Sequence, residues 1–195
     1  MIEDQNTVTH AFTAPSDFRP RAIRSITDVM NKSSCTLRPA TVDDLSAINA
    51  IYNHFVQHST CTYQEVPDDL EGRQKWFALH DAKHPVIVAE ASGQIVGWGS
   101  LSTFHTRSAF RFTTENSVYV HHAYHKRGIG SAILNELVTS AAILGHHAIM
   151  AGIDSEQEGS IALHAKFRFQ KVAHLKQVGF KFGRWLDVVY MEFLL

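Results

Sequence analysis

The sequence predicts an α/β domain built on a mixed sheet of about six or seven strands. Short segments rich in β-branched and aromatic residues alternate along the chain with segments whose apolar residues recur at helical spacing. A basic turn with two glycines joins one of these strands to one of these helices at residues 117–130. The 195 residues, 45% of them hydrophobic, are enough to bury one core. Helices that lie between strands in this way indicate a mixed sheet.

Each element is predicted from its own local pattern. Thr41 and Asp44 form a capping pattern ahead of the first helix. Ser92 and Gly93 mark the turn of a hairpin, and Gly145 ends the third helix. The expected strands are residues 35–41, 86–89, 95–101, 110–120, 147–153, 171–178 and 186–194. The expected helices are residues 45–55, 67–79, 129–144 and 159–167.

Residues 1–34 differ in composition from the rest of the chain. They are rich in Thr, Ser, Asp, Asn and Pro. We therefore expect a flexible N-terminal extension, with a short helix near residues 22–31, ahead of one domain at 35–195. The segment that starts at Met30 resembles a natural beginning, and translation from Met30 is a hypothesis that the intact mass of the native protein tests.

Composition and charge exclude several classes of protein. A net charge of −1 gives no reason to expect nucleic acid or a membrane as a partner. No segment has the apolar length of a membrane span and the acidic N-terminus does not resemble a secretory signal, so we expect a cytoplasmic protein. Two cysteines, Cys35 and Cys61, exclude a disulfide framework. The histidines predict no metal site, because adjacent histidines on a strand face opposite sides of a sheet.

The turn between the strand and the third helix has the features of an anion-binding site. Gly128 and Gly130 lack Cβ atoms, so an anion can approach the unpaired N–H groups and the positive end of the helix dipole. Lys126 and Arg127 add positive charge at the rim. The spacing fails the dinucleotide-binding pattern, because Ile133 stands where a third glycine is needed. An ordinary strand–turn–helix connection with solvated basic residues is the alternative.

The stretch Tyr124-His-Lys-Arg-Gly-Ile-Gly130 resembles the acetyl-CoA pyrophosphate loop of the GCN5-related N-acetyltransferase (GNAT) superfamily. That family writes the loop as Gln/Arg-x-x-Gly-x-Gly/Ala, and His125 stands here at the Gln/Arg position. The resemblance implies a GNAT fold with a mostly antiparallel sheet, and acetyl-CoA as co-substrate without a metal. The residues that it implies for pyrophosphate binding are His125, Lys126, Arg127, Gly128, Ile129, Gly130 and Ser131.

Further stretches resemble, more narrowly, the phosphinothricin and methionine sulfoximine N-acetyltransferases. Together with the loop they cover most of the chain from residue 37 to 195. The resemblance implies a small amino-acid-like acceptor whose α-amino group attacks the thioester directly. Transfer to protein or peptide amines, and acetyl-CoA binding without turnover, are the alternatives. The matching stretches are residues 50–55, 59–63, 110–120, 160–164 and 178–187.

The same resemblance implies roles near the thioester. Glu115 matches the family's base, which is needed because an α-amino group is mostly protonated at neutral pH; a solvated or ion-paired carboxylate is the alternative. His164 matches the family's histidine and is the candidate acid for the CoA thiolate, or else a packed helix residue. Gln157 stands where the family has an asparagine that contacts the cofactor. The expected oxyanion donors are the main-chain N–H groups of Val118, Tyr119 and Val120.

Acceptor recognition is expected from residues on the loop before the central strand. Arg107 matches the family's arginine and suits a carboxylate, with Phe110 and Thr113 beside it. Phe110 replaces a common tyrosine, which removes a hydroxyl donor and favours a less polar acceptor side chain. Lys181 and Arg184 are candidates for the same mouth. Exposed side chains without such a role are the alternative for the three basic residues.

Residues 178–187 predict a symmetric homodimer. Phe180, Phe182, Trp185 and Leu186 bring aromatic and apolar surface into a segment whose glycines argue against a plain central strand. Such a surface is usually covered, and a two-fold partner is the commonest cover. The alternative is that these residues close the core of the monomer.

Overall fold

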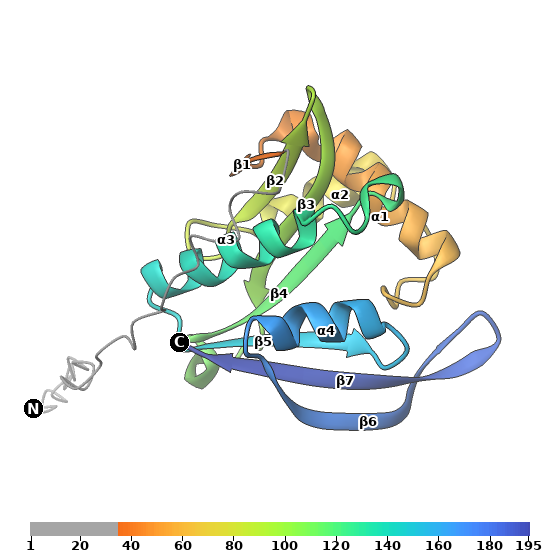
Figure 1. Ribbon diagram of the computed structural model, residues 1–195, viewed down its shortest axis with the longest axis vertical. Coiled ribbons are helices and arrows are strands. Elements are labelled where there is room, and N and C mark those ends of the chain that lie inside the picture. The colour runs from red at the N-terminus through yellow and green to blue at the C-terminus, as the bar shows by residue number, and fades with distance from the viewer. Residues whose placement is uncertain (1–34) are drawn as a thin grey trace, which may run out of the picture.

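The computed structural model describes residues 35–195 as a seven-stranded sheet with helices on both faces (Figure 1). This confirms the predicted α/β class with a mixed, mostly antiparallel sheet. The strands are β1 (Thr36–Pro39), β2 (Val86–Ala91), β3 (Gln94–Thr103), β4 (Thr113–Val120), β5 (Ala148–Asp154), β6 (Gln170–Lys181) and β7 (Arg184–Leu194). The α-helices are α1 (Leu45–His58), α2 (Leu70–Ala78), α3 (Ile129–Ile143) and α4 (Glu158–Lys166). Three 3-10 turns are η1 (Val42–Asp44), η2 (Ser108–Phe110) and η3 (His122–Tyr124).

The expectations for residues 1–34, which are the extension, the helix near 22–31 and the start at Met30, lie outside the described residues. No helix within residues 35–195 combines the length and the apolar character needed to cross a membrane.

The sheet order is β1-β2-β3-β4-β5-β7-β6, and among the strands of residues 35–195 only β4 and β5 pair in parallel. Their pairing is short, because it joins residues 113–115 to residues 148–150 and then stops. The ladder between β3 and β4 continues as far as Val120. The two central strands therefore start side by side and diverge toward α4 and α1, as Figure 1 shows. This divergence leaves one edge of β4 unpaired and creates the space for a site.

Two apolar clusters hold the helices on opposite faces of the sheet. Buried residues of α3, among them Ile133 and Leu137, pack with β3, β5 and β7 on one face. On the other face, α1 packs around Trp98 of β3. Gly99 sets how closely α3 approaches, because a Cβ atom there would lie 2.5 Å from the Ile133 side chain. The helical spacing read from the sequence is therefore the packing face of the helix.

Several expected boundaries were wrong, among them the start of α2, which is Leu70 and not residue 67. Phe110 lies in η2 instead of a strand, so β4 begins three residues later, at Thr113. The hairpin of β6 and β7 runs through the glycine-containing segment and turns at Phe182 and Gly183, whose φ angles are 53° and 75°. Gly179 pairs directly with Leu186, so the weak strand preference of glycine is offset by a buried partner across the ladder.

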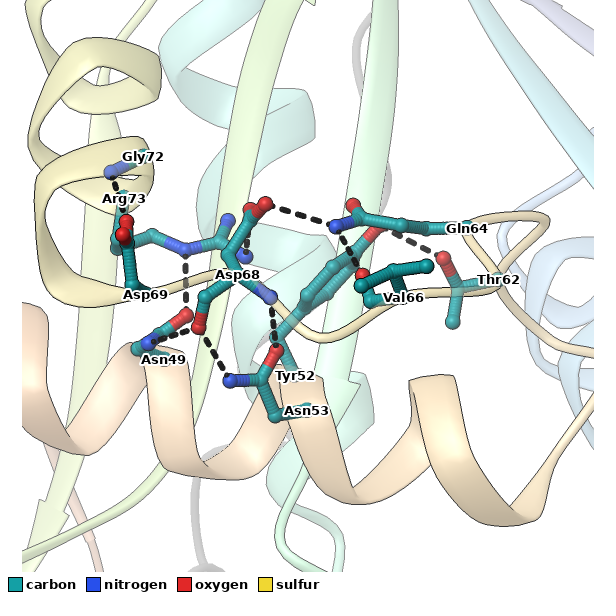
Figure 2. A network of polar contacts seen from close by, with 10 residues as sticks. All are labelled: Asn49, Tyr52, Asn53, Thr62, Gln64, Val66, Asp68, Asp69, Gly72 and Arg73. Carbon is teal, nitrogen blue, oxygen red and sulfur yellow. Dashed lines mark hydrogen bonds and ion pairs between the residues drawn. The ribbon is translucent and has the colours of Figure 1, made fainter.

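A polar network fixes the loop of residues 59–69 between α1 and α2 (Figure 2). Asp68 is its centre: its carboxylate pairs with the buried Arg73 at 3.0 Å and accepts from Gln64 at 2.8 Å. Its main-chain carbonyl accepts from Asn49 and Asn53 of α1. The second half of the loop is therefore held on α1 by side chains from both helices.

Candidate active site

A cavity of about 630 Å³ lies where β4 and β5 diverge. It is bounded by β4, β5, the turn before α3, the start of α4, and the loop that carries Cys61. The structure brings eleven of the residues predicted from the sequence to its walls: Val118, Tyr119, Val120, His125, Lys126, Gly128, Ile129, Gly130, Ser131, Gln157 and His164.

The turn before α3 lies at one end of this cavity and has a backbone that suits an anion. Lys126 and Gly128 both have left-handed backbone angles, with φ of 60° and 82°. Such alternation turns successive N–H groups toward one point, and the first N–H groups of α3 continue the set. His125 bonds through Nε2 to the Val120 carbonyl at 2.9 Å, which ties the turn to the end of β4. Arg127 lies outside the cavity wall, with its guanidinium 4.8 Å from the centre of the Tyr124 ring.

The main chain of β4 supplies donors to the gap. The His121 N–H donates to Val96 of β3, so the alternation of a strand directs the main-chain groups of Tyr119 toward β3 and those of Val118 and Val120 toward the gap. The N–H groups of Val118 and Val120 are therefore placed to act as the predicted oxyanion donors. Tyr119 lines the cavity but directs no main-chain N–H into the gap.

Glu115 lies on β4 at the point where pairing with β5 ends. Its carboxylate accepts from the Gly152 N–H, and a Cβ atom on Gly152 would lie 3.2 Å from Oε1, so glycine makes room for the carboxylate there. Burial raises the pKa of Glu115, and the bond from Gly152 partly opposes the rise. A carboxylate that binds protons more readily than usual suits a base that accepts a proton from an ammonium group.

His164 is buried on the opposite face of the sheet, and both of its ring nitrogens are engaged. Nδ1 lies 2.8 Å from the Ser160 carbonyl, which accepts only if Nδ1 carries the hydrogen. Nε2 then accepts from the Asn116 amide at 3.0 Å. Burial lowers the pKa of His164. Burial therefore favours the neutral imidazole, and the contact with Ser160 places its one hydrogen on Nδ1, directed at the main chain.

The loop over the cavity is anchored from below. Lys181 was expected at an exposed mouth, but it is 1% exposed, and its ammonium donates to the carbonyls of Ser59 at 2.8 Å and Thr62 at 2.7 Å. Two carbonyl acceptors compensate the burial of its charge. Gln157 donates to the Thr60 hydroxyl at 3.3 Å, so its amide joins α4 to the same loop.

The profile of the Acetyltransferase (GNAT) family matches residues 48–169. The chain belongs to this family. It is 38% identical over 158 residues to the L-methionine sulfoximine/L-methionine sulfone acetyltransferase of Salmonella typhimurium, covering 80% of this chain and 92% of that one.

Solved GNAT structures are also similar to this protein. A phosphinothricin acetyltransferase from Sinorhizobium meliloti in complex with acetyl-CoA is 35% identical with a TM-score of 0.79, covering 83% of this chain and 89% of that one. A ribosomal-protein-alanine N-acetyltransferase from Brucella melitensis is 41% identical with a TM-score of 0.80, covering 82% of this chain and 99% of that one.

The acceptor residues predicted for this GNAT protein lie outside the cavity wall. Arg107 is exposed on the loop before η2. The Phe110 ring packs 4.8 Å from His105 and is 38% exposed. Thr113 pairs with Ala148 where β4 and β5 are still together. Arg184 forms an ion pair with Glu156 at the start of α4. Roles for these residues in acceptor binding remain predictions.

Several residues of this GNAT site were missed by the sequence analysis. Phe55, Cys61, Tyr124, Asp154 and Leu163 all line the cavity. Four of them stand in stretches that the sequence analysis singled out, but none of the five was given a role there. Only the periodicity of α1 and β5 could have placed Phe55 and Asp154 on a face. Among residues 35–195, no group of three or more potential metal ligands is arranged to hold an ion.

Proposed function

We propose that this GNAT protein transfers the acetyl group of acetyl-CoA to the α-amino group of a small amino-acid-like acceptor. Methionine sulfoximine, methionine sulfone and phosphinothricin are the candidate acceptors, as the names of its relatives suggest. The observation that carries the proposal is the gap between β4 and β5, which has a turn suited to an anion at one end and the half-buried carboxylate of Glu115 next to it.

The cavity suits acetyl-CoA as the acetyl donor. The pyrophosphate would lie on the N–H groups between His125 and Ser131, where the left-handed turn and the start of α3 favour an anion. The arm of acetyl-CoA that links the pyrophosphate to the thioester would extend along the unpaired edge of β4. The thioester carbonyl would then lie near the Val118 and Val120 N–H groups, which stabilise the negative charge that develops on its oxygen.

The transfer can be written with every proton placed. Glu115 takes one proton from the acceptor's ammonium group, and the neutral amine attacks the thioester carbon. The carbon–sulfur bond breaks as the amide forms, and the nitrogen loses its second excess proton to the departing thiolate. Because this proton comes from the nitrogen, the step does not require a hydrogen from His164.

A homodimer is the assembly that we propose. Phe180, Phe182 and Trp185 are 52%, 56% and 61% exposed, and the Phe180 and Trp185 rings meet edge to face at 5.0 Å. Leu186, which was expected in the same surface, is instead 2% exposed and belongs to the core. The three exposed rings form an aromatic patch on the hairpin of β6 and β7, which two copies could cover mutually. The cytoplasmic location also remains a prediction.

The acetyltransferase proposal is tested by release of free CoA from acetyl-CoA with a panel of acceptors. We expect release with methionine sulfone, methionine sulfoximine or phosphinothricin, and a product acetylated on its α-nitrogen by mass spectrometry. A peptide with an N-terminal alanine tests the alternative suggested by the Brucella relative, and we expect no release with it. Acetyl-CoA binding without release for any amino acid would contradict the proposal.

A further inference from the structure

Asp154, at the end of β5, is a buried carboxylate whose second oxygen has no partner. The residue is 1% exposed and lines the cavity. Its Oδ1 atom accepts from the Glu156 N–H at 3.2 Å. Its Oδ2 atom has no hydrogen-bond partner among the residues that the structure describes. The transfer outlined above gives this residue no part.

Neighbouring cations do not neutralise Asp154. Arg184 is the basic group whose pKa responds to it, but the Arg184 guanidinium binds both oxygens of Glu156. The ammonium group of Lys181 donates to the carbonyls of Ser59 and Thr62 in the loop after α1. No ion pair to Asp154 is present within residues 35–195. A buried charge without a partner destabilises a fold, so such a group indicates a ligand that supplies the missing contact.

Asp154 lies on the same face of the sheet as Glu115. Side chains alternate along β5, so Asp154 shares a face with Gly152, and Gly152 is the residue whose N–H binds the Glu115 carboxylate. The backbone positions of Gly152 and Asp154 are about 6.6 Å apart along β5. An ammonium group that bonds to two carboxylates bridges oxygens about 4.6 Å apart, because each charged hydrogen bond is about 2.8 Å long and two N–H bonds of an ammonium diverge at about 109°.

We propose that Asp154 binds the ammonium group of the acceptor together with Glu115. The inference rests on the proposed amino-acid acetyltransfer and adds a residue that selects the amine. Rotation of an aspartate carboxylate about χ2 is soft, so Oδ2 can turn to a group in the cavity with little rearrangement. The acceptor's cation supplies the partner that the carboxylate lacks.

The two carboxylates then have different tasks. Glu115 receives the proton, and its pKa is raised by burial as that task requires. Asp154 keeps a hydrogen bond to the remaining N–H and directs the nitrogen lone pair at the thioester carbon. The pair also selects for acceptors, because an analogue with hydrogen in place of the amine leaves both carboxylates without a partner.

The test compares Asp154→Asn with the wild type and with Asp44→Asn. The amide of Asp154→Asn keeps an acceptor for the Glu156 N–H but carries no charge, so we expect the KM for methionine sulfone to rise at least tenfold. The affinity for acetyl-CoA by calorimetry should be unchanged. Inhibition by the deaminated analogue, 4-(methylsulfonyl)butanoate, should be unchanged or stronger. Asp44 is also buried but is paired with Arg38, so Asp44→Asn should leave the KM unchanged.

Melting temperatures provide a readout that is independent of activity. Removing an unpartnered charge should leave the melting temperature of Asp154→Asn equal to or above that of the wild type, whereas Asp44→Asn should melt lower. Three results for Asp154→Asn would each overturn the role of Asp154. One is a KM equal to that of the wild type, and another is a KM and an inhibition constant of the analogue that rise by the same factor. The third is a melting temperature below that of the wild type. The proposed function would stand in all three cases. A wild type that acetylates no amino acid would instead overturn the function, and the ammonium site with it.

Discussion

Glu115 and Asn116 are neighbours on β4 that serve opposite faces of the sheet, because side chains alternate along a strand. Glu115 faces Gly152 on the side of the sheet where Asp154 lies, whereas Asn116 bonds to His164 of α4 on the other side. The thioester would lie in the gap on the β5 side of β4, where that edge of the strand is unpaired. The Glu115 carboxylate, which is the proposed base, is therefore separated from the His164 imidazole by the strand itself.

His164 gives a prediction at the scale of the residue. A general acid contributes about 10²–10⁴ to a rate, but the hydrogen of His164 lies on Nδ1 and is bound to the Ser160 carbonyl. We therefore expect His164→Gln to lower kcat by less than tenfold, with acetyl-CoA affinity unchanged. The measurement is steady-state kinetics with saturating acetyl-CoA at neutral pH. A loss of a hundredfold or more in a variant that still binds acetyl-CoA would assign the acid role to His164 after all.

The elements around the cavity are fixed by short local motifs. Lys126 and Gly128 adopt left-handed angles that aim the turn at an anion. Asp68 and Arg73 hold the loop above the cavity in place, as Figure 2 shows. Each motif places a backbone segment before any ligand arrives, which lowers the entropy cost of binding.

The turn before α3 is tested by Gly130→Val. A Cβ atom at Gly130 would meet Leu163 at 3.4 Å, an ordinary contact, so the variant should fold. The two further methyl groups would occupy space near the N–H groups of the helix start, and we expect acetyl-CoA affinity to fall by a hundredfold or more. Thr139→Val, on the exposed face of the same helix, is the control and should bind normally. Unchanged affinity in a folded Gly130→Val protein, measured by calorimetry, would place the pyrophosphate elsewhere.

The start of α1 gives a prediction about stability and pH. Asp44 accepts from both terminal nitrogens of Arg38 and from the Thr41 N–H, and the Arg38 bonds lower the pKa of Asp44 to about 2. A depressed folded pKa stabilises the protein above the unfolded value of about 3.9, and this stability is lost as the pH falls toward 2. Asp44→Asn should therefore lower the free energy of unfolding by about 2 kcal/mol at pH 7. Urea unfolding of the wild type and Asp44→Asn measures this loss. If the two proteins differ in free energy of unfolding by the same amount at pH 7 and pH 2.5, the stabilisation does not come from the ionised carboxylate.

At the scale of the whole molecule, the aromatic patch of the β6–β7 hairpin predicts assembly. We expect Trp185→Glu to convert a dimer into monomers, because a charge at a buried contact would be left without a partner. Val172→Glu, near the start of β6 and away from the patch, should stay dimeric. Light scattering at tens of micromolar distinguishes the two states, and a monomeric wild type would refute the assembly.

The order of the elements was predictable from the sequence, because the apolar spacing of α3 and the β-branched runs of β2 and β5 are local. The turn at Gly128 and Gly130 was predictable for the same reason. The length of β6 and β7 was not, since Gly179 is paired through a contact across the hairpin. The burial of Lys181 was also beyond prediction, because it depends on contacts with a loop more than a hundred residues earlier in the chain.

In the reaction that we propose, an acetyl group passes to an amine in the gap between β4 and β5, with Glu115 as the base. Its most direct test is the rate of methionine sulfone acetylation by wild type and Glu115→Gln from pH 6 to pH 9, with acetyl-CoA affinity measured in parallel. We predict equal affinity and a loss of at least a hundredfold in kcat/KM. The deficit should be largest at low pH, where more of the amine is protonated. Equal rates for the two proteins across this pH range would show that Glu115 is not the base.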